Sequence, residues 1–148
     1  MKTEKTQERN VAEARVVETI EAPVDAVWAA LGNFAGIQPG PGITAVSYEG
    51  EGVGMIRTLV MGGAQVVERL EEHDAERLTF TYAIINDDSP LPFSNYSATV
   101  LITDNGDGTS TVDWTGTFEP KGVPEADAIN VATGIYAGGI KGAQIALE

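Results

Sequence analysis

The chain has 148 residues, of which 43% are hydrophobic and 21% charged, enough apolar material for the core of one ordinary domain. Nine basic and 22 acidic residues give a formal charge of -13, which disfavours binding to nucleic acid and to anionic membrane surfaces. No cysteine is present, so disulfides, thiolate nucleophiles and cysteine metal sites are excluded.

The amino-terminal segment, residues 1–10, is polar and is not followed by an apolar run. We expect it to be a flexible extension of a single domain that takes up residues 1–148. No part of the chain approaches the roughly 18 apolar residues that a membrane-spanning helix needs. The sequence therefore predicts a soluble, cytoplasmic protein with no integral membrane segment.

The first predicted element is a β-branched strand of about nine residues within "VAEARVVETIEAP", residues 11–23. Pro23 suits the first turn of a helix. Apolar residues then recur at intervals of three and four, at Val24, Val27, Trp28, Leu31 and Phe34. This pattern predicts a helix with stopping points at Gly32 and Gly36, followed by the irregular connection "IQPGPG".

Six short segments of alternating character follow, separated by turn residues. They are residues 43–50, 55–61, 64–73, 77–85, 96–104 and 110–119. The short turns between neighbours predict an antiparallel meander, which makes seven strands with the first one. The longer connection "NDDSPLPFSN", residues 86–95, is a candidate for the mouth of a pocket.

A closing helix is predicted from Pro124 onward, because apolar residues recur along one stripe. These are Ile129, Ala132, Tyr136, Ile140, Ala143 and Leu147. The helix also contains four glycines, each costing roughly 0.5–1 kcal/mol relative to alanine: Gly134, Gly138, Gly139 and Gly142. They either allow close packing against the sheet or leave room for a bound molecule.

This order of elements resembles the helix-grip fold of the START-like, birch-pollen-allergen-like superfamily, the SRPBCC proteins. Five segments are similar to its bacterial polyketide cyclase/dehydrase and lipid-transport branch: "IEAPVDAVWAALGNFAGI", "GVGMIRTLVMGGAQVVERLEEHD", "RLTFTYAI", "PLPFSNYSATVLI" and "TVDWTGTFEP". The resemblance runs from about Val11 to Leu147. It implies an α+β domain in which a seven-stranded antiparallel curved sheet wraps around the long carboxyl-terminal helix, with short helices after the first strand and an apolar cavity inside.

A carboxylate lies on the inward face of this sheet. Period-two alternation places Glu68 between Val66 and Leu70 on one face of its strand. The same argument points twelve further residues inward: Leu78, Phe80, Tyr82 and Ile84; Tyr96, Ala98, Val100 and Ile102; Val112, Trp114, Gly116 and Phe118. Glu68 is therefore expected beside two tyrosines and a tryptophan.

An unpaired buried carboxylate is costly, so a cation is expected near Glu68. In the neighbouring segment "MIRTLVM" two faces compete, one with Arg57, Leu59 and Met61 and the other with Ile56, Thr58 and Val60. We place the Arg57 face inward, because Arg57 is the best-placed cation across the Gly62-Gly63 turn.

Three roles are open to the Arg57–Glu68 pair. It can be a structural ion pair that tyrosine hydroxyls help to satisfy. It can be a polar anchor for the carbonyl or hydroxyl group of an otherwise apolar ligand. It can also be catalytic, with Glu68 as general base, Arg57 stabilising an enolate and a tyrosine returning the proton. Aldol-type cyclisation and dehydration fit this last set, and the resemblance to aromatase/cyclase relatives implies such chemistry.

We favour the ligand anchor, because the fold that the resemblance implies is hollow at its centre. The residues expected to contact a ligand are Arg57, Glu68, Phe80, Tyr82, Asn86, Tyr96, Trp114 and Tyr136. His73, within the charged stretch "EEHDAER", is expected to be exposed in a turn. No nucleophile with an adjacent base, phosphate-binding loop or metal-ligand spacing is present, so neither cofactor nor metal is expected.

The sequence thus predicts binding of a small hydrophobic molecule that is polyketide-, lipid- or terpenoid-like. Two alternatives are a cyclase, dehydratase or isomerase that uses Glu68 and Arg57, and a non-enzymatic accessory protein that acts through its surface. A homodimer is compatible with each. For an anchor, Glu68→Gln and Arg57→Met should change binding more than folding; for a structural pair, either change should cost several kcal/mol of stability.

Overall fold

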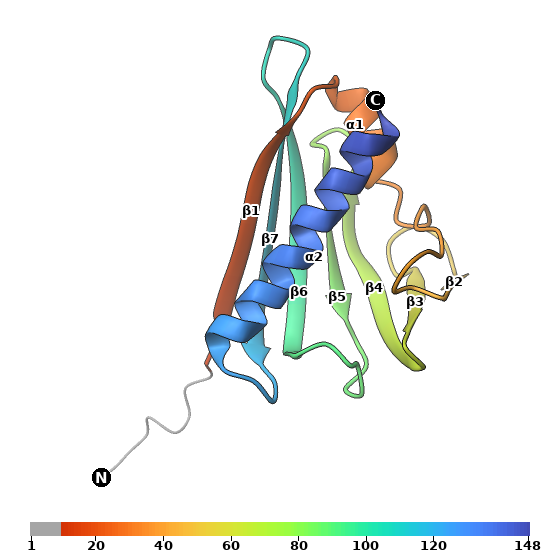
Figure 1. Ribbon diagram of the computed structural model, residues 1–148. Coiled ribbons are helices and arrows are strands. Elements are labelled where there is room, and N and C mark those ends of the chain that lie inside the picture. Colours follow the sequence, from red (N-terminus) through yellow and green to blue (C-terminus); the bar gives the residue numbers. More distant parts are fainter. Residues whose placement is uncertain (1–9) are drawn as a thin grey trace.

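The computed structural model describes residues 10–148, so the segment expected to be flexible lies outside the described residues as far as residue 9. Seven strands and two helices make up the domain (Figure 1). In chain order they are β1 (Ala12–Ile20), α1 (Val24–Leu31), β2 (Ala45–Glu49), β3 (Ile56–Met61), β4 (Ala64–Asp74), β5 (Thr79–Ile84), β6 (Phe93–Asp104), β7 (Ser110–Pro120) and α2 (Glu125–Ala146).

All seven strands form one antiparallel sheet with the order β1-β7-β6-β5-β4-β3-β2. The predicted meander is therefore confirmed, with β1 added beside β7. Helix α2 runs across one face of the curved sheet, and α1 lies near its carboxyl-terminal end (Figure 1). This is the α+β helix-grip arrangement that the order of elements predicts.

Helix α1 is shorter than its apolar stripe. It ends at Leu31, where the backbone N–H of Gly32 donates to the carbonyl of Trp28 at 2.7 Å. Phe34, the last residue of the stripe, lies in the irregular segment 32–44 and is nevertheless buried. One short helix thus follows β1, and the segment after it brings Phe34 back towards the sheet.

The inward faces agree with the predicted alternation. Tyr82, Tyr96 and Phe118 are each less than 5% exposed, and Ala98, Val100, Ile102 and Val112 on β6 and β7 are similarly buried, whereas Trp114 is half-buried. On β3, Arg57 and Leu59 are buried while Ile56, Thr58 and Val60 are only half-buried, which confirms the choice of the Arg57 face. Leu78 lies just before β5 and is half-buried.

Helix α2 covers this face with small side chains and two large ones. Tyr136 and Ile140 are fully buried, and small residues occupy the rest of the stripe: Ala128, Ala132 and Ala143. The small residues let the helix approach the sheet closely where the sheet presents its own large side chains. Neither helix within residues 10–148 is both long and apolar enough to cross a membrane.

Candidate functional site

A cavity of about 660 Å³ lies between the sheet, α1 with the segment after it, and the carboxyl-terminal half of α2. Small or apolar residues form most of its wall: Ala29, Ala30, Leu31, Gly36, Ile37, Phe80, Trp114, Gly139, Gly142, Ala143 and Ala146. Its polar wall residues are Asn33, Gln38, Arg57 and Tyr82. Small-molecule sites usually measure about 300–1,000 Å³, so this cavity is large enough for a ligand.

The glycines of α2 serve two purposes along this wall. A Cβ atom added to Gly139 would lie 2.7 Å from Cζ3 of Trp114, so the helix touches the indole ring here and only glycine fits. A Cβ atom added to Gly142 would meet no atom within 4 Å, and Gly142 lines the cavity. Close packing and free space both occur, at different glycines.

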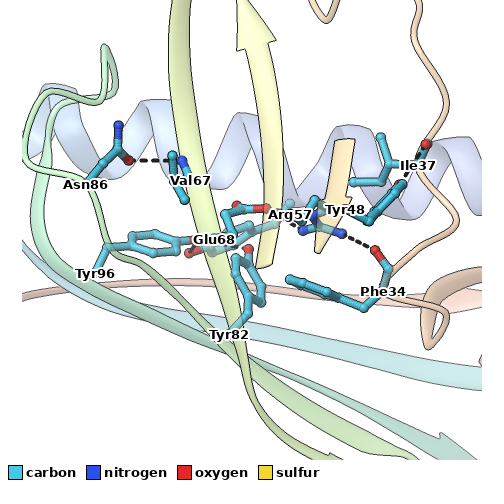
Figure 2. A network of polar contacts seen from close by, with 10 residues as sticks. Phe34, Ile37, Tyr48, Arg57, Val67, Glu68, Tyr82, Asn86 and Tyr96 are labelled. Atoms are coloured by element: carbon cyan, nitrogen blue, oxygen red, sulfur yellow. Dashed lines mark hydrogen bonds and ion pairs between the residues drawn. The ribbon is translucent and has the colours of Figure 1, made fainter. Parts of the chain in front are cut away.

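Arg57 and Glu68 form a buried ion pair at the centre of the site (Figure 2). They lie directly opposite each other on β3 and β4, as expected for strands joined by a tight turn. Nε of Arg57 donates to Oε1 of Glu68 at 2.7 Å, and Nη2 lies 2.6 Å from the same oxygen. The two side chains are only 9% and 8% exposed. Both geometry and burial thus support a strong charge-assisted contact.

Phe34 is the third member of this site, and the sequence pattern does not reveal it. Nη1 of Arg57 donates to the carbonyl oxygen of Phe34 at 3.0 Å, and the guanidinium carbon lies 3.9 Å above the Phe34 ring. The hydroxyl of Tyr48 on β2 donates to the carbonyl of Ile37 at 2.9 Å (Figure 2). These two contacts attach the irregular segment beside the cavity to β3 and β2.

Burial controls the ionisation of Glu68. It raises the pKa of the carboxyl above its ordinary value of 4.5, and the opposing charge and hydrogen bond of Arg57 only partly reverse this effect. Such a shift is typical of desolvated carboxyls in functional sites and in buried ion pairs alike. Arg57 lines the cavity, whereas Glu68 is absent from its lining, so Glu68 lies behind Arg57 as seen from the cavity.

Three tyrosine hydroxyls form a chain next to the ion pair. Tyr82 and Tyr96 are joined at 3.0 Å, and Tyr96 and Tyr136 at 2.7 Å. Burial raises the pKa of all three hydroxyls, that of Tyr136 to about 12, and the charge of Glu68 adds to the rise at Tyr82 and Tyr136. The chain therefore stays protonated near neutral pH and serves as a set of neutral hydrogen-bonding groups.

Trp114 is part of the cavity wall and has an unusual polar atom. Its ring stacks on Tyr136, with centroids 5.0 Å apart and 12° between the planes. Its Nε1 is buried, and no hydrogen-bond partner for it is found within residues 10–148. A buried N–H without a partner is costly. Packing against Tyr136 and Gly139 stabilises the indole in this position despite that cost.

Asn86 is separate from this group. Its Oδ1 accepts from the backbone N–H of Val67 at 2.9 Å (Figure 2), and its Nδ2 donates to the carbonyl of Gln65 at 2.9 Å. It lines a different hollow of about 370 Å³, together with Tyr96 and Lys121. The side chain is thus occupied in joining the loop after β5 to β4, and the structure does not bring it into the main cavity.

His73 is exposed, as expected, but it belongs to β4 and has defined contacts. The pairing of β4 with β5 shifts between Leu70 and Glu72, so His73 faces Phe80 across the ladder. Its Nε2–H donates to the carbonyl of Gly32 at 2.9 Å, and its ring centroid is 5.0 Å from that of Trp28. The bulge explains this placement, because it changes which face each residue occupies.

Within residues 10–148, no three histidine, aspartate or glutamate side chains gather as they would around a metal ion.

Comparison with known protein families identifies the group to which this fold belongs. The family of polyketide cyclase / dehydrase and lipid transport proteins matches residues 11–148. The chain belongs to this family. The match includes every strand and both helices, so the resemblance seen in the sequence is confirmed.

Solved structures from the same fold agree with this family. An uncharacterised protein from Bacillus thuringiensis is 32% identical over 91% of this chain and 98% of its own, with a TM-score of 0.79. The protein XoxI from Bacillus cereus is 32% identical over 91% and 94% of the two chains, with a TM-score of 0.80. A protein from Nitrosospira multiformis, 21% identical over 91% and 94% with a TM-score of 0.71, shares the fold. No curated protein matches the chain.

Proposed function

We propose that this member of the polyketide cyclase/dehydrase and lipid-transport family binds a small, mainly apolar molecule in its central cavity, with Arg57 as the polar anchor. The observation that carries the proposal is a buried guanidinium in the wall of an otherwise mainly apolar 660 Å³ cavity. Polyketide-, lipid- and terpenoid-like compounds have the required character, a large apolar body with few oxygen atoms.

Arg57 has hydrogen-bonding capacity left for such a ligand. A guanidinium has five N–H groups. Two of them face Glu68 and one donates to Phe34, so two have no partner within residues 10–148. We assign these two to an oxygen atom of the ligand. The wall around Arg57 adds Phe80 and Trp114 as apolar contacts and the Tyr82 ring on β5. Glu68, Tyr96 and Tyr136 would support the anchor from behind this wall.

The cyclase, dehydratase or isomerase alternative is supported by the raised pKa of Glu68 next to a cation. A general base must come within hydrogen-bond reach of the proton that it removes. Arg57 and Tyr82 line the cavity and Glu68 does not, so the geometry favours binding over proton abstraction by Glu68.

Mass spectrometry of molecules recovered from the purified protein tests these functions together. Wild type and Glu68→Gln are incubated with a pool of polycyclic, polyketide and terpenoid compounds, washed and extracted. We expect wild type to return a subset of the pool unchanged, and Glu68→Gln to return a different or weaker subset. Compounds altered in mass or retention time only with wild type would support the enzyme instead. Recovery of nothing from wild type would contradict cavity binding and favour an accessory role through the surface.

A further inference from the structure

The charge of Arg57 is already neutralised inside the protein. Arg57 is the only charged residue among those that line the cavity in the described part of the chain. Two of its nitrogens share one oxygen of Glu68 at 2.6 and 2.7 Å, and both side chains are more than nine-tenths buried. The cavity wall therefore presents N–H donors without a net positive charge.

This arrangement treats neutral and anionic ligands differently. A ketone or other neutral acceptor can take the remaining N–H groups of Arg57 while the ion pair stays intact. A carboxylate bound to Arg57 would place a second negative charge close to the buried carboxylate of Glu68, on a chain with a formal charge of -13. Like charges that share one guanidinium repel each other, and the repulsion is stronger beside a buried group than in bulk water.

We propose that Glu68 makes the cavity selective for uncharged molecules with a hydrogen-bond acceptor and excludes carboxylates. The role of Glu68 is then to set specificity, since it acts through the guanidinium and not by contact with the ligand. This inference rests on the proposed function, because it concerns the same cavity.

The groups around Glu68 determine how the selectivity between ketone and carboxylate changes with pH. Arg57 on β3 is its cation, and the neutral hydroxyls of Tyr82 on β5 and Tyr136 on α2 are electrostatically coupled to it. Protonation of Glu68 would remove the negative charge that neutralises Arg57, so the guanidinium could then attract an anion. Because both tyrosines stay protonated, the affinity for a carboxylate should fall as pH rises and Glu68 ionises, while the affinity for a ketone should change little.

Three compounds that share one ring system separate these effects: fluorene, 9-fluorenone and fluorene-9-carboxylate. Their affinities are measured by calorimetry from pH 6 to 9 with wild type, Glu68→Gln and Arg57→Met/Glu68→Gln. At pH 9 we expect wild type to bind the ketone at least about tenfold more tightly than the carboxylate. Glu68→Gln should bind the carboxylate at least about tenfold more tightly than wild type does, with no dependence on pH. The double variant, which has neither charge, should bind ketone and fluorene alike.

The measurements distinguish failure of cavity binding from failure of charge selection by Glu68. If wild type binds none of the three compounds, the proposed cavity function fails. If wild type binds fluorene and the ketone but also binds the carboxylate equally well at pH 9, cavity binding stands and charge selection by Glu68 is wrong. An unchanged carboxylate affinity in Glu68→Gln would overturn it as well. Should Glu68→Gln fail to fold, the wild-type ratio of ketone to carboxylate and the double variant still decide the matter.

Discussion

Arg57→Met is expected to lower the free energy of unfolding by about 3–5 kcal/mol at pH 8 and by clearly less at pH 5. The substitution leaves the Glu68 carboxylate buried without its cation, and it also removes the donor to the Phe34 carbonyl. Glu68 does not line the cavity, so water cannot easily replace the guanidinium. Urea denaturation at the two pH values measures the effect.

The dependence on pH follows from the raised pKa of Glu68. A carboxyl whose pKa is higher in the folded than in the unfolded state favours the protonated fold. Its contribution to stability is complete below the unfolded value, near 4.5, and is lost as pH rises through the folded value. Loss of Arg57 raises that folded value further, so the difference between Arg57→Met and wild type should grow from pH 5 to pH 8.

Glu68→Gln should be the milder change, because its amide oxygen can still accept from Arg57 and the cavity gives the guanidinium access to water. Arg57→Met/Glu68→Gln should recover most of the stability that Arg57→Met loses. The expectation that an anchor residue affects binding more than folding therefore holds for Glu68→Gln but not for Arg57→Met, because loss of Arg57 leaves a buried carboxylate without its cation whatever the role of the pair. Equal and large losses in both single variants, with recovery in the double variant, would show that the pair is structural and would contradict the ligand anchor.

Gly116→Ala is expected to destabilise the fold by about 3 kcal/mol. A Cβ atom at this position on β7 would lie 1.9 Å from the hydroxyl oxygen of Tyr136 and 3.1 Å from its Cζ. Tyr136 is fully buried and cannot step aside without giving up its hydrogen bond to Tyr96. Thermal or urea denaturation would measure the loss.

Two further variants test whether the loss of stability comes from the clash with the Tyr136 hydroxyl. Tyr136→Phe in the Gly116→Ala background removes the clashing hydroxyl and should restore part of the lost stability. Gly134→Ala on α2 adds the same methyl group where no atom lies within 4 Å, and it should stabilise the helix by roughly 0.5–1 kcal/mol. If Gly116→Ala is as stable as wild type, the tight contact between Tyr136 and β7 does not exist in solution.

The ion pair could be predicted from the sequence because it depends on regular alternation. The tight Gly62-Gly63 turn fixes the register of β3 against β4, and one cation on the inward face then lies opposite Glu68. The same regularity makes the inward tyrosines and Trp114 predictable. Local pattern was sufficient wherever the backbone stayed periodic.

The rest of the site depends on features that periodicity does not encode. Phe34 takes part through a backbone carbonyl in an irregular segment, so its identity as a phenylalanine gives no sign of that role. The contacts of His73 follow from the bulge between Leu70 and Glu72. The side-chain bonds of Asn86 to β4 depend on how its loop folds back. Each of these requires the tertiary structure.

An obstructing side chain in the cavity tests whether an apolar molecule binds there. Ala143 is buried and lines the cavity, whereas Ala137 is half-buried on the same helix and does not. Equilibrium dialysis of the compound pool against wild type, Ala143→Trp and Ala137→Trp, with circular dichroism as a check on folding, gives the comparison. We expect wild type and Ala137→Trp to retain the same compounds and Ala143→Trp to lose them. Equal retention by all three proteins would contradict binding in the cavity.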